Sequence, residues 1–325
     1  MPGFSFFNVV PDFLCHCEIN TRLTNINEDN IEKHPLTIAT FFHQQFLNKI
    51  HPYIDGSGQI IKPGCADYGI KNLYCHLYIE LMEYKEIKPC KELASFIHSY
   101  WELKGNESDR QWERNFPDGC AGLVMNLGNT CLTDNGLVRM EFGKTYVVGA
   151  MTSFKDSFID NETHLLGICL KPGAFYNFYS YASQNELIDN TVEFEKNNSF
   201  NIDKIIKTPI HYLNQFFLDR KKNKYNLLES PINDIHSTNG QISIHELSKR
   251  NFTTVRQLER NFKKHIGLSP KEYANIVRFQ HALTIIRKSA GSQSLLEIAF
   301  ECGYYDHSHL TNEIKRNTGF SPSLL

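Results

Sequence analysis

The sequence contains no run of about eighteen apolar residues, which is the length that a helix needs to cross a bilayer. Its N-terminus, Met1 to Val10, lacks the basic start and the long apolar stretch of a signal peptide. Hydrophobic residues make up 41% of the chain and charged residues 22%, as is typical of a globular protein. We therefore expect a protein that is neither membrane-spanning nor exported, and that works in the cytoplasm.

The short motifs of several enzyme classes are also missing. There is no Walker loop, no Gly-x-Ser-x-Gly and no His-Glu-x-x-His, and residues 82–200 contain only two histidines, His98 and His164. One alternative stays open, a cysteine-based transferase or hydrolase domain fused to a C-terminal binding module, with Cys120 or Cys169 as the nucleophile. Neither cysteine stands beside a base-bearing motif, so we expect no enzymatic activity.

None of the nine cysteines forms a Cys-x-x-Cys pair. The nearest approach to a metal cluster has spacings that match no zinc pattern; it consists of Cys15-His16-Cys17 with Cys65, Cys75 and His76. We expect reduced and mostly buried cysteines, and we predict neither a metal nor a cofactor.

Charge is distributed unevenly along the chain. The whole sequence carries a net charge of −2, whereas residues 240–325 hold 12 Lys and Arg against 7 Asp and Glu, a net +5 that leaves −7 on the remainder. A basic end on an acidic body suits a module that meets nucleic-acid phosphates. A solvated basic surface is the alternative that charge alone leaves open.

The pattern of the sequence divides the chain into four parts. Residues 1–81 are polar and poorly patterned; one hypothesis is that translation begins at Met82 and that this extension is not native, which an intact mass would test. Residues 82–200 predict a β-rich domain, residues 201–227 a helical linker, and residues 228–325 a helical domain.

Turn signals separate short apolar runs in the β-rich part. Pro117-Asp118-Gly119 and Asp134-Asn135-Gly136 supply the turn chemistry. After Gly173 we expect a helix, and in residues 201–224 apolar residues recur at helical spacing, with Pro209 starting, kinking or splitting that helix. The expected strands are residues 96–103, 121–127, 145–151 and 164–170.

The last region contains a repeat of itself at an offset of 52 residues, because residues 255–270 align with residues 307–322. Two copies this similar indicate a duplicated unit. The matched pairs include Leu258 and Leu310, Phe262 and Ile314, Gly267 and Gly319, and Ser269-Pro270 and Ser321-Pro322.

Each copy has the pattern of two helices joined by a tight turn. Thr254 and Asp306 are suited to cap the second helix of each unit, and Gly303 permits the positive φ that a sharp turn needs. A glycine, Gly267 or Gly319, ends each second helix. Helix, short turn and capped amphipathic helix together predict a helix-turn-helix unit.

A helix is also expected between the two units, over residues 269–287, with Ser269-Pro270 as its start. At 1.5 Å per residue this spacer spans roughly 25 Å. Such a spacer would allow two reading helices to enter successive major grooves, about 34 Å apart on one face of a duplex.

The residues from Ile242 to Leu325 resemble the AraC/XylS transcription regulators, in particular residues 256–264, 267–273 and 298–310. The resemblance covers about a quarter of the chain and implies two helix-turn-helix units that bind asymmetric sites in double-stranded promoter DNA. We expect a transcription activator with RNA polymerase as a partner, although the sequence leaves the choice between activator and repressor open, and either a monomer or a homodimer. Leu310 and Ile314 stand where the family usually has Phe, which keeps those positions apolar.

The middle region, through residues 114–120 and 167–173, resembles an uncharacterised domain that often precedes such modules. The predicted fold class is therefore α+β, with a β-rich sensor domain, distantly cupin-like in one interpretation, followed by an all-α double helix-turn-helix domain. A small-molecule effector is the expected regulator.

The second helix of each unit should present base-reading side chains from its N-terminal half. Arginine can bind guanine and asparagine can bind adenine, although arginine bound to phosphate is the alternative. His307 and His309 lie two residues apart on a helix and so do not share a face for a metal. The predicted base-reading residues are Thr254, Arg256, Gln257, Arg260, His307, Ser308, His309 and Asn312. Predicted phosphate contacts are Lys263, Lys264, Lys315 and Arg316.

Aromatic residues are plentiful in residues 82–200 and predict either an effector pocket or an ordinary core. Arg114 and Asp118 are expected either to form a turn-stabilising ion pair or to contact the ligand. The candidate pocket residues are Trp101, Trp112, Arg114 and Asp118.

Overall fold

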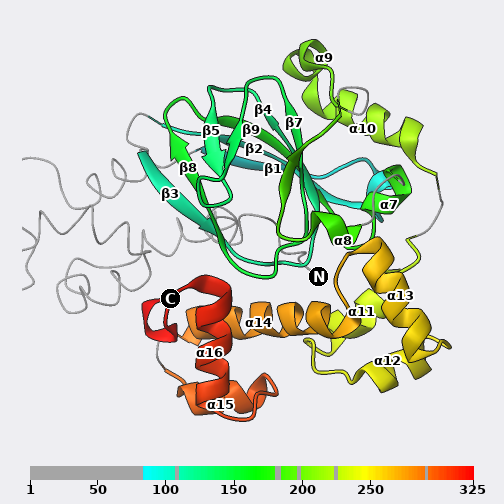
Figure 1. The fold of residues 1–325 in the computed structure, drawn as a ribbon, viewed down its shortest axis with the longest axis vertical. Coiled ribbons are helices and arrows are strands. Elements are labelled where there is room, and N and C mark those ends of the chain that lie inside the picture. The colour runs from blue at the N-terminus through cyan, green and yellow to red at the C-terminus, as the bar shows by residue number, and fades with distance from the viewer. Residues whose placement is uncertain (1–82, 107–109, 180–183, 196–198, 223–225, 290–291) are drawn as a thin grey trace, which may run out of the picture.

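A computed structural model describes residues 83–106, 110–179, 184–195, 199–222, 226–289 and 292–325 (Figure 1). The hypothesis of a start at Met82 and the cysteines before residue 76 lie outside these residues. A β-rich part is followed by a helical part, as the sequence predicted.

A six-stranded antiparallel sheet forms the centre of the β-rich part. Two small ladders, β3 with β8 and β5 with β6, lie beside it. The sheet order is β1 (Glu83–Ile87), β2 (Ile97–Lys104), β9 (His164–Leu170), β4 (Gly122–Asn126), β7 (Thr145–Val148) and β10 (Thr191–Glu193). The ladder strands are β3 (Arg110–Asn115), β8 (Lys155–Asp160), β5 (Cys131–Thr133) and β6 (Val138–Met140).

The four strands expected from the sequence are present as β2, β4, β7 and β9. The other six strands were not expected. They are three to six residues long, and β3, with the sequence RQWERN, has no alternation of apolar and polar residues. Their pairing with longer neighbours fixes them, so pattern alone could not identify them.

Both faces of the central sheet are buried. Along β4, Leu123 and Met125 join one apolar cluster and Val124 joins the other, because successive side chains of a strand point to opposite faces. The first cluster packs against α10 (Pro209–Arg220) through Leu213 and Phe217. The same cluster includes residues of η2 (Lys91–Leu93), α7 (Phe175–Phe178), α8 (Gln184–Leu187) and α9 (Ile202–Lys207).

Pro209 splits the helical segment that was expected after residue 200. Helix α9 ends at Lys207 and α10 starts at Pro209 itself, where the missing N–H of proline costs no hydrogen bond. The helix expected after Gly173 is only four residues long.

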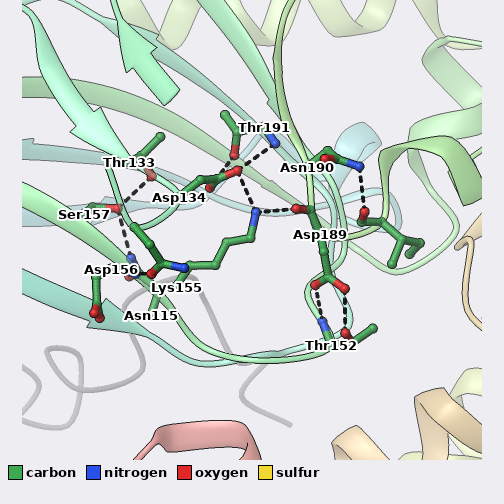
Figure 2. A network of polar contacts seen from close by, with 12 residues as sticks. Asn115, Thr133, Asp134, Thr152, Lys155, Asp156, Ser157, Asp189, Asn190 and Thr191 are labelled. Atoms are coloured by element: carbon green, nitrogen blue, oxygen red, sulfur yellow. Dashed lines mark hydrogen bonds and ion pairs between the residues drawn. The ribbon is translucent and has the colours of Figure 1, made fainter. Parts of the chain in front are cut away.

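A buried ion pair fastens the small ladders to the sheet (Figure 2). Nζ of Lys155 lies 2.7 Å from Oδ2 of Asp134, and both side chains are about nine-tenths buried. The same ammonium donates to the carbonyl of Asp189, while Asp134 accepts hydrogen bonds from the backbone N–H and the hydroxyl of Thr191. Asp134 thereby holds the β5–β6 turn, β8 and the start of β10 together.

The helical part contains two cores, one for each repeat. Leu258 and Phe262 belong to the first core, and Leu310 and Ile314 to the second. No helix among the described residues is long and apolar enough to cross a membrane. The helices are α11 (Glu229–Ser237), α12 (Ile244–Arg250), α13 (Val255–His265), α14 (Pro270–Ser289), α15 (Leu295–Glu301), α16 (His307–Thr318) and η3 (Pro322–Leu324).

Candidate nucleic-acid interface

The first repeat folds as two helices, α12 and α13, joined by a tight turn. Thr254 Oγ1 accepts a hydrogen bond from the backbone N–H of Gln257 at 3.1 Å, which is the predicted cap of α13. The left-handed residue of this turn is Phe252, with φ +49, and its side chain is 98% exposed. The first unit therefore has the tight turn expected between its two helices, with the positive φ at a phenylalanine instead of a glycine.

The second repeat, α15 and α16, has the same construction. Ser294 and Glu297 form a capping box at the start of α15, and Asp306 Oδ1 accepts the N–H of His309 at 2.7 Å at the start of α16. Gly303 adopts φ +71 in the turn and Gly319 adopts φ +74 at the end of α16, as predicted for both.

Helix α14 joins the two units and fixes their separation. Ser269 and Glu272 cap its start reciprocally, since Ser269 Oγ accepts the N–H of Glu272 and Glu272 Oε2 accepts the N–H of Ser269. Its twenty residues span about 30 Å. In Figure 1, α13 and α16 lie near opposite ends of α14.

The predicted base-reading residues of α13 lie on its accessible face. Thr254, Arg256 and Arg260 are exposed, and Gln257 is half-buried. The guanidinium of Arg260 donates to Oε1 of Gln257, whose Nε2 donates in turn to Asn261 Oδ1 at 2.8 Å. These contacts hold the arginine along the helix, from which it can extend toward a base or a phosphate.

The corresponding residues of α16, His307, Ser308, His309 and Asn312, are all exposed. The ring of His309 lies edge-on to Tyr304, with centroids 5.3 Å apart, so a buried aromatic residue orients it. The base-reading role of both sets remains a prediction.

The four predicted phosphate contacts occupy the last turns of α13 and α16. Lys263 pairs with Glu272 at 3.1 Å, Arg316 pairs with Glu313 at 2.6 Å, and Lys315 is exposed. Nζ of Lys264 lies 4.9 Å from the ring centroid of Tyr176, in the β-rich part. Lys264 therefore has a partner that the sequence did not predict, and its phosphate role remains a prediction.

The C-terminal ends of both predicted reading helices meet the β-rich part. At the end of α13, the ring of His265 packs edge-on against Tyr176, and burial lowers the pKa of His265. At the end of α16, Arg114 Nη1 donates to the carbonyl of Thr318 at 3.2 Å. The predicted base readers are in the first two turns of each helix, away from these contacts.

Helix α14 also packs on the β-rich part, at the turn Pro117-Asp118-Gly119. The side-chain amide of Gln280 donates to the carbonyl of Pro117, and Gly119 lies against the ring of Tyr273. A Cβ added at Gly119, which has φ +73, would lie 2.6 Å from Cε2 of that ring. Sequence analysis identified this turn but not its partners, which come from 150 or more positions further along the chain.

The four candidate pocket residues do not form one site. Trp101 and Asp118 line the same small cavity, whereas Trp112 is 46% exposed and packs against Phe158 on the outer ladder. The expected ion pair of Arg114 with Asp118 is wrong. Arg114 instead forms a two-pronged pair with Asp156, at 2.7 and 2.8 Å, because β3 pairs with β8 in a register that places Arg114 opposite Asp156.

A larger cleft, of about 740 Å³, lies between β7, β10 and helices α9 and α10. Phe216 and Tyr212 are among its aromatic residues, and Lys144, Lys204 and Arg220 among its basic ones. Its size is within the range of small-molecule sites. This cleft could not be predicted from the sequence, because its walls come from segments that show ordinary helix and strand patterns.

Asp118 is a buried carboxyl group next to two cysteines. Burial raises its pKa to about 7, and its Oδ1 accepts the N–H of Cys120 at 2.8 Å. A side-chain hydrogen bond with Cys169, together with burial, raises the pKa of the Cys120 thiol. A cysteine nucleophile needs a lowered thiol pKa, so these surroundings do not favour the cysteine-enzyme alternative.

The geometry defines a class of protein: two helix-turn-helix units, joined by a helical spacer, follow a β-rich part in the sequence. Comparison with family models agrees, since residues 247–325 match a helix-turn-helix domain and residues 85–193 match a domain of unknown function, DUF6597. The C-terminal region is an AraC-type helix-turn-helix domain, as predicted from its residues, and a DUF6597 domain precedes it.

Curated relatives match this C-terminal region. The HTH-type transcriptional activator RhaS of Escherichia fergusonii is 35% identical over 81 residues, which are 25% of this chain and 28% of that protein. RhaS of Salmonella arizonae is 36% identical over 69 residues, 21% of this chain and 24% of its own. The chain thus matches about a quarter of the length of these relatives.

Solved structures resemble the chain more distantly. ToxT from Vibrio cholerae covers 75% of this chain with 97% of its own, at 14% identity and a TM-score of 0.37. A transcriptional regulator with an AraC-type DNA-binding domain from Chromobacterium violaceum covers 29% of this chain with 84% of its own, at 22% identity and a TM-score of 0.27.

Proposed function

We propose that this protein is a transcription regulator that binds double-stranded promoter DNA through α13 and α16, with the β-rich part controlling that binding. In this proposal residues 228–325 are the DNA-binding domain, residues 82–200 the regulatory domain and residues 201–227 the linker. The protein acts in the cytoplasm, where its DNA target lies, and carries out no enzymatic reaction.

The observation that carries the proposal is the doubled unit itself. Two helices at equivalent positions of a 52-residue repeat are capped by Thr254 and Asp306, expose polar side chains over their first two turns, and bury their apolar faces. A capped helix that presents such side chains next to a tight turn is suited to enter a major groove. A spacer of about 30 Å suits two successive grooves on one face of the duplex.

The name of the curated relatives, transcriptional activator, supports an activating role, for which contact with RNA polymerase is needed. Control by the β-rich part is supported by its contacts with α13, α14 and α16 at Tyr176, Pro117 and Arg114. An effector that shifts any of these contacts would change the position of α13 and α16 relative to each other, and with it the affinity for DNA. A monomer and a homodimer are both compatible with the proposal.

The test is selection of bound fragments from random and genomic duplex DNA by the full chain, at a defined salt concentration. The expected result is one asymmetric motif with two short blocks about one helical turn apart. The variant Arg260→Ala/Asn312→Ala, which removes one reader from each helix, should lose enrichment of both blocks.

Lys207→Ala, an exposed change at the end of α9, is the matched control and should select the same motif as the unmodified protein. Salt-sensitive binding without a motif would reduce the function to non-specific DNA binding. Absence of binding would overturn the proposal.

A further inference from the structure

A cluster of three metal-ligating groups, two of them buried and the third, Cys120, half-buried, lies where the β-rich part meets α14. One carboxylate oxygen of Asp118, Sγ of Cys120 and Sγ of Cys169 all lie within 4.8 Å of one another. Asp118 and Cys120 flank Gly119 in the turn before β4, and Cys169 is on the neighbouring strand β9, opposite Gly122. Sequence analysis considered these three residues separately and could not bring them together, since Cys120 and Cys169 are 49 positions apart.

These donors converge on a small enclosed space. Asp118, Cys120 and Cys169 line a cavity of about 10 Å³, together with the side chains of Trp101 and Met151. A cavity of that volume holds about one water molecule, so it has room for an ion but not for an organic molecule. Its apolar walls would keep competing water away.

The donor set selects the kind of ion. Two thiolates favour a thiophilic ion, and the addition of a carboxylate is typical of zinc rather than of magnesium or calcium, which take oxygen ligands. Donors around a tetrahedral zinc ion lie about 3.5–3.8 Å apart, given bond lengths of about 2.0–2.3 Å. Small side-chain rotations would bring the three groups to that distance.

We propose that Asp118, Cys120 and Cys169 bind a divalent metal ion of the zinc class, and that this ion is an effector of the protein. Three protein ligands are the usual number in an open zinc site. Binding displaces the thiol protons into solvent, and coordination keeps the two sulfurs as thiolates.

The site is connected to the DNA-binding domain through a single turn. Gly119, between two of the ligands, touches the ring of Tyr273, and Pro117, just before Asp118, accepts the hydrogen bond of Gln280. Tyr273 is fully buried, and its hydroxyl lies 2.9 Å from Nε2 of His236 on α11. An ion that draws Asp118 toward the two sulfurs therefore moves a turn that is packed on α14. The consequence for DNA rests on the proposed function; the metal site itself does not.

The site is tested by titrating the metal-free, reduced full chain with Co²⁺, whose absorption reports thiolate coordination and tetrahedral geometry. One equivalent of Co²⁺ with thiolate charge-transfer bands, displaced by Zn²⁺, is expected. Cys120→Ser and Cys169→Ser should lose these bands, and Asp118→Asn should keep them with the dissociation constant raised about tenfold or more. Cys131→Ser removes another buried free thiol of the β-rich part and should bind as the unmodified protein does.

Circular dichroism of each variant separates loss of the site from loss of the fold, and Asp118→Asn provides a readout if a cysteine variant does not fold. Absence of thiolate bands in the folded, unmodified chain would overturn the site. So would bands of unchanged intensity and unchanged Co²⁺ affinity in both folded cysteine variants, since each variant removes one of the two sulfur ligands of the proposed site.

The effector role is tested by measuring the affinity for selected DNA with Zn²⁺ and after chelation. A change of about fivefold or more in the unmodified chain, absent in Cys169→Ser, is expected for an allosteric ligand. If one equivalent of metal bound and the affinity for DNA did not change, the effector role would be overturned, but the metal site would stand. Metal binding without any specific DNA binding would instead count against the proposed function, because the Co²⁺ signal does not involve DNA.

Discussion

Arg114, on strand β3, donates a hydrogen bond from Nη1 to the carbonyl oxygen of Thr318, the last residue of α16, at 3.2 Å. The last carbonyls of a helix have no partner within the helix, and a positive charge is favourable there. The guanidinium also lies 4.0 Å from the ring centroid of Phe154 and 4.7 Å from that of Phe320. A side chain of the β-rich part thus caps the C-terminal end of α16, one of the two predicted reading helices.

Replacing Arg114 with Lys should weaken this junction despite keeping the charge. Lysine cannot form the two-pronged contact with Asp156 and reach Thr318 at the same time, because it lacks the planar fork. We expect Arg114→Lys to lower the free energy of unfolding by about 1–3 kcal/mol in urea denaturation.

Arg110→Ala is the matched control, since Arg110 is an exposed arginine at the start of the same strand. It should change the free energy of unfolding by less than about 0.5 kcal/mol. Equal losses in the two variants would mean that Arg114 acts as an ordinary surface residue of β3.

The buried pair of Lys155 and Asp134 makes a second prediction. Lys155→Met leaves the Asp134 carboxylate buried without its cation, and we expect the free energy of unfolding to fall by about 3–5 kcal/mol. Lys144→Met removes a surface ammonium, paired with Glu141 and Glu193, and should lower the free energy of unfolding much less, because solvent screens an exposed ion pair. Urea denaturation at neutral pH compares the two, and a loss at Lys155 no larger than at Lys144 would contradict the role assigned to the buried pair.

His98 predicts a loss of stability in acid. Burial lowers its pKa from the usual 6.5 to about 4, with a further contribution from the ammonium of Lys88. Between pH 6.5 and pH 4 the unfolded chain binds a proton at this position that the folded chain does not, so stability falls as the pH falls through this range. His98→Gln should flatten that part of the curve of unfolding free energy against pH. A curve as steep as that of the unmodified protein would assign the acid sensitivity to other groups.

The sequence predicted features whose causes are local. The caps at Thr254 and Asp306, the left-handed Gly303 and the split at Pro209 each follow from the chemistry of a few adjacent residues. The repeat strengthened the prediction of two helix-turn-helix units, because the pattern of each copy supported the interpretation of the other. Apolar alternation was sufficient for the four strands of the sheet that are present as β2, β4, β7 and β9.

The junction between the two parts could not be predicted in this way. Gln280 meets Pro117 across 163 positions and Arg114 meets Thr318 across 204, and neither pair has a local signature. Arg114 was assigned to Asp118 because the two are close in sequence, whereas the register of β3 with β8 places Asp156 opposite it. Long-range packing and strand register decide such contacts, and local patterns in a single sequence do not predict either of them.

The assignment of reading and phosphate roles makes the last prediction. Arg260→Ala should reduce discrimination at one operator position by about 1–3 kcal/mol while leaving the affinity for random duplex nearly unchanged. Lys315→Ala should weaken specific and random sequences alike and lower the slope of log affinity against log salt by about one. We expect the same uniform loss for Lys264→Ala if its ammonium leaves the ring of Tyr176 for a phosphate in the complex.

Measuring each variant on selected and on random duplex at several salt concentrations separates these roles. The difference between specific and random affinity reports base reading, and the salt slope reports phosphate contact. If Arg260→Ala and Lys315→Ala lowered both affinities by the same factor with the same change in slope, Arg260 would be a phosphate contact. The reading role on α13 would then belong to Arg256, the other exposed arginine of its first turns.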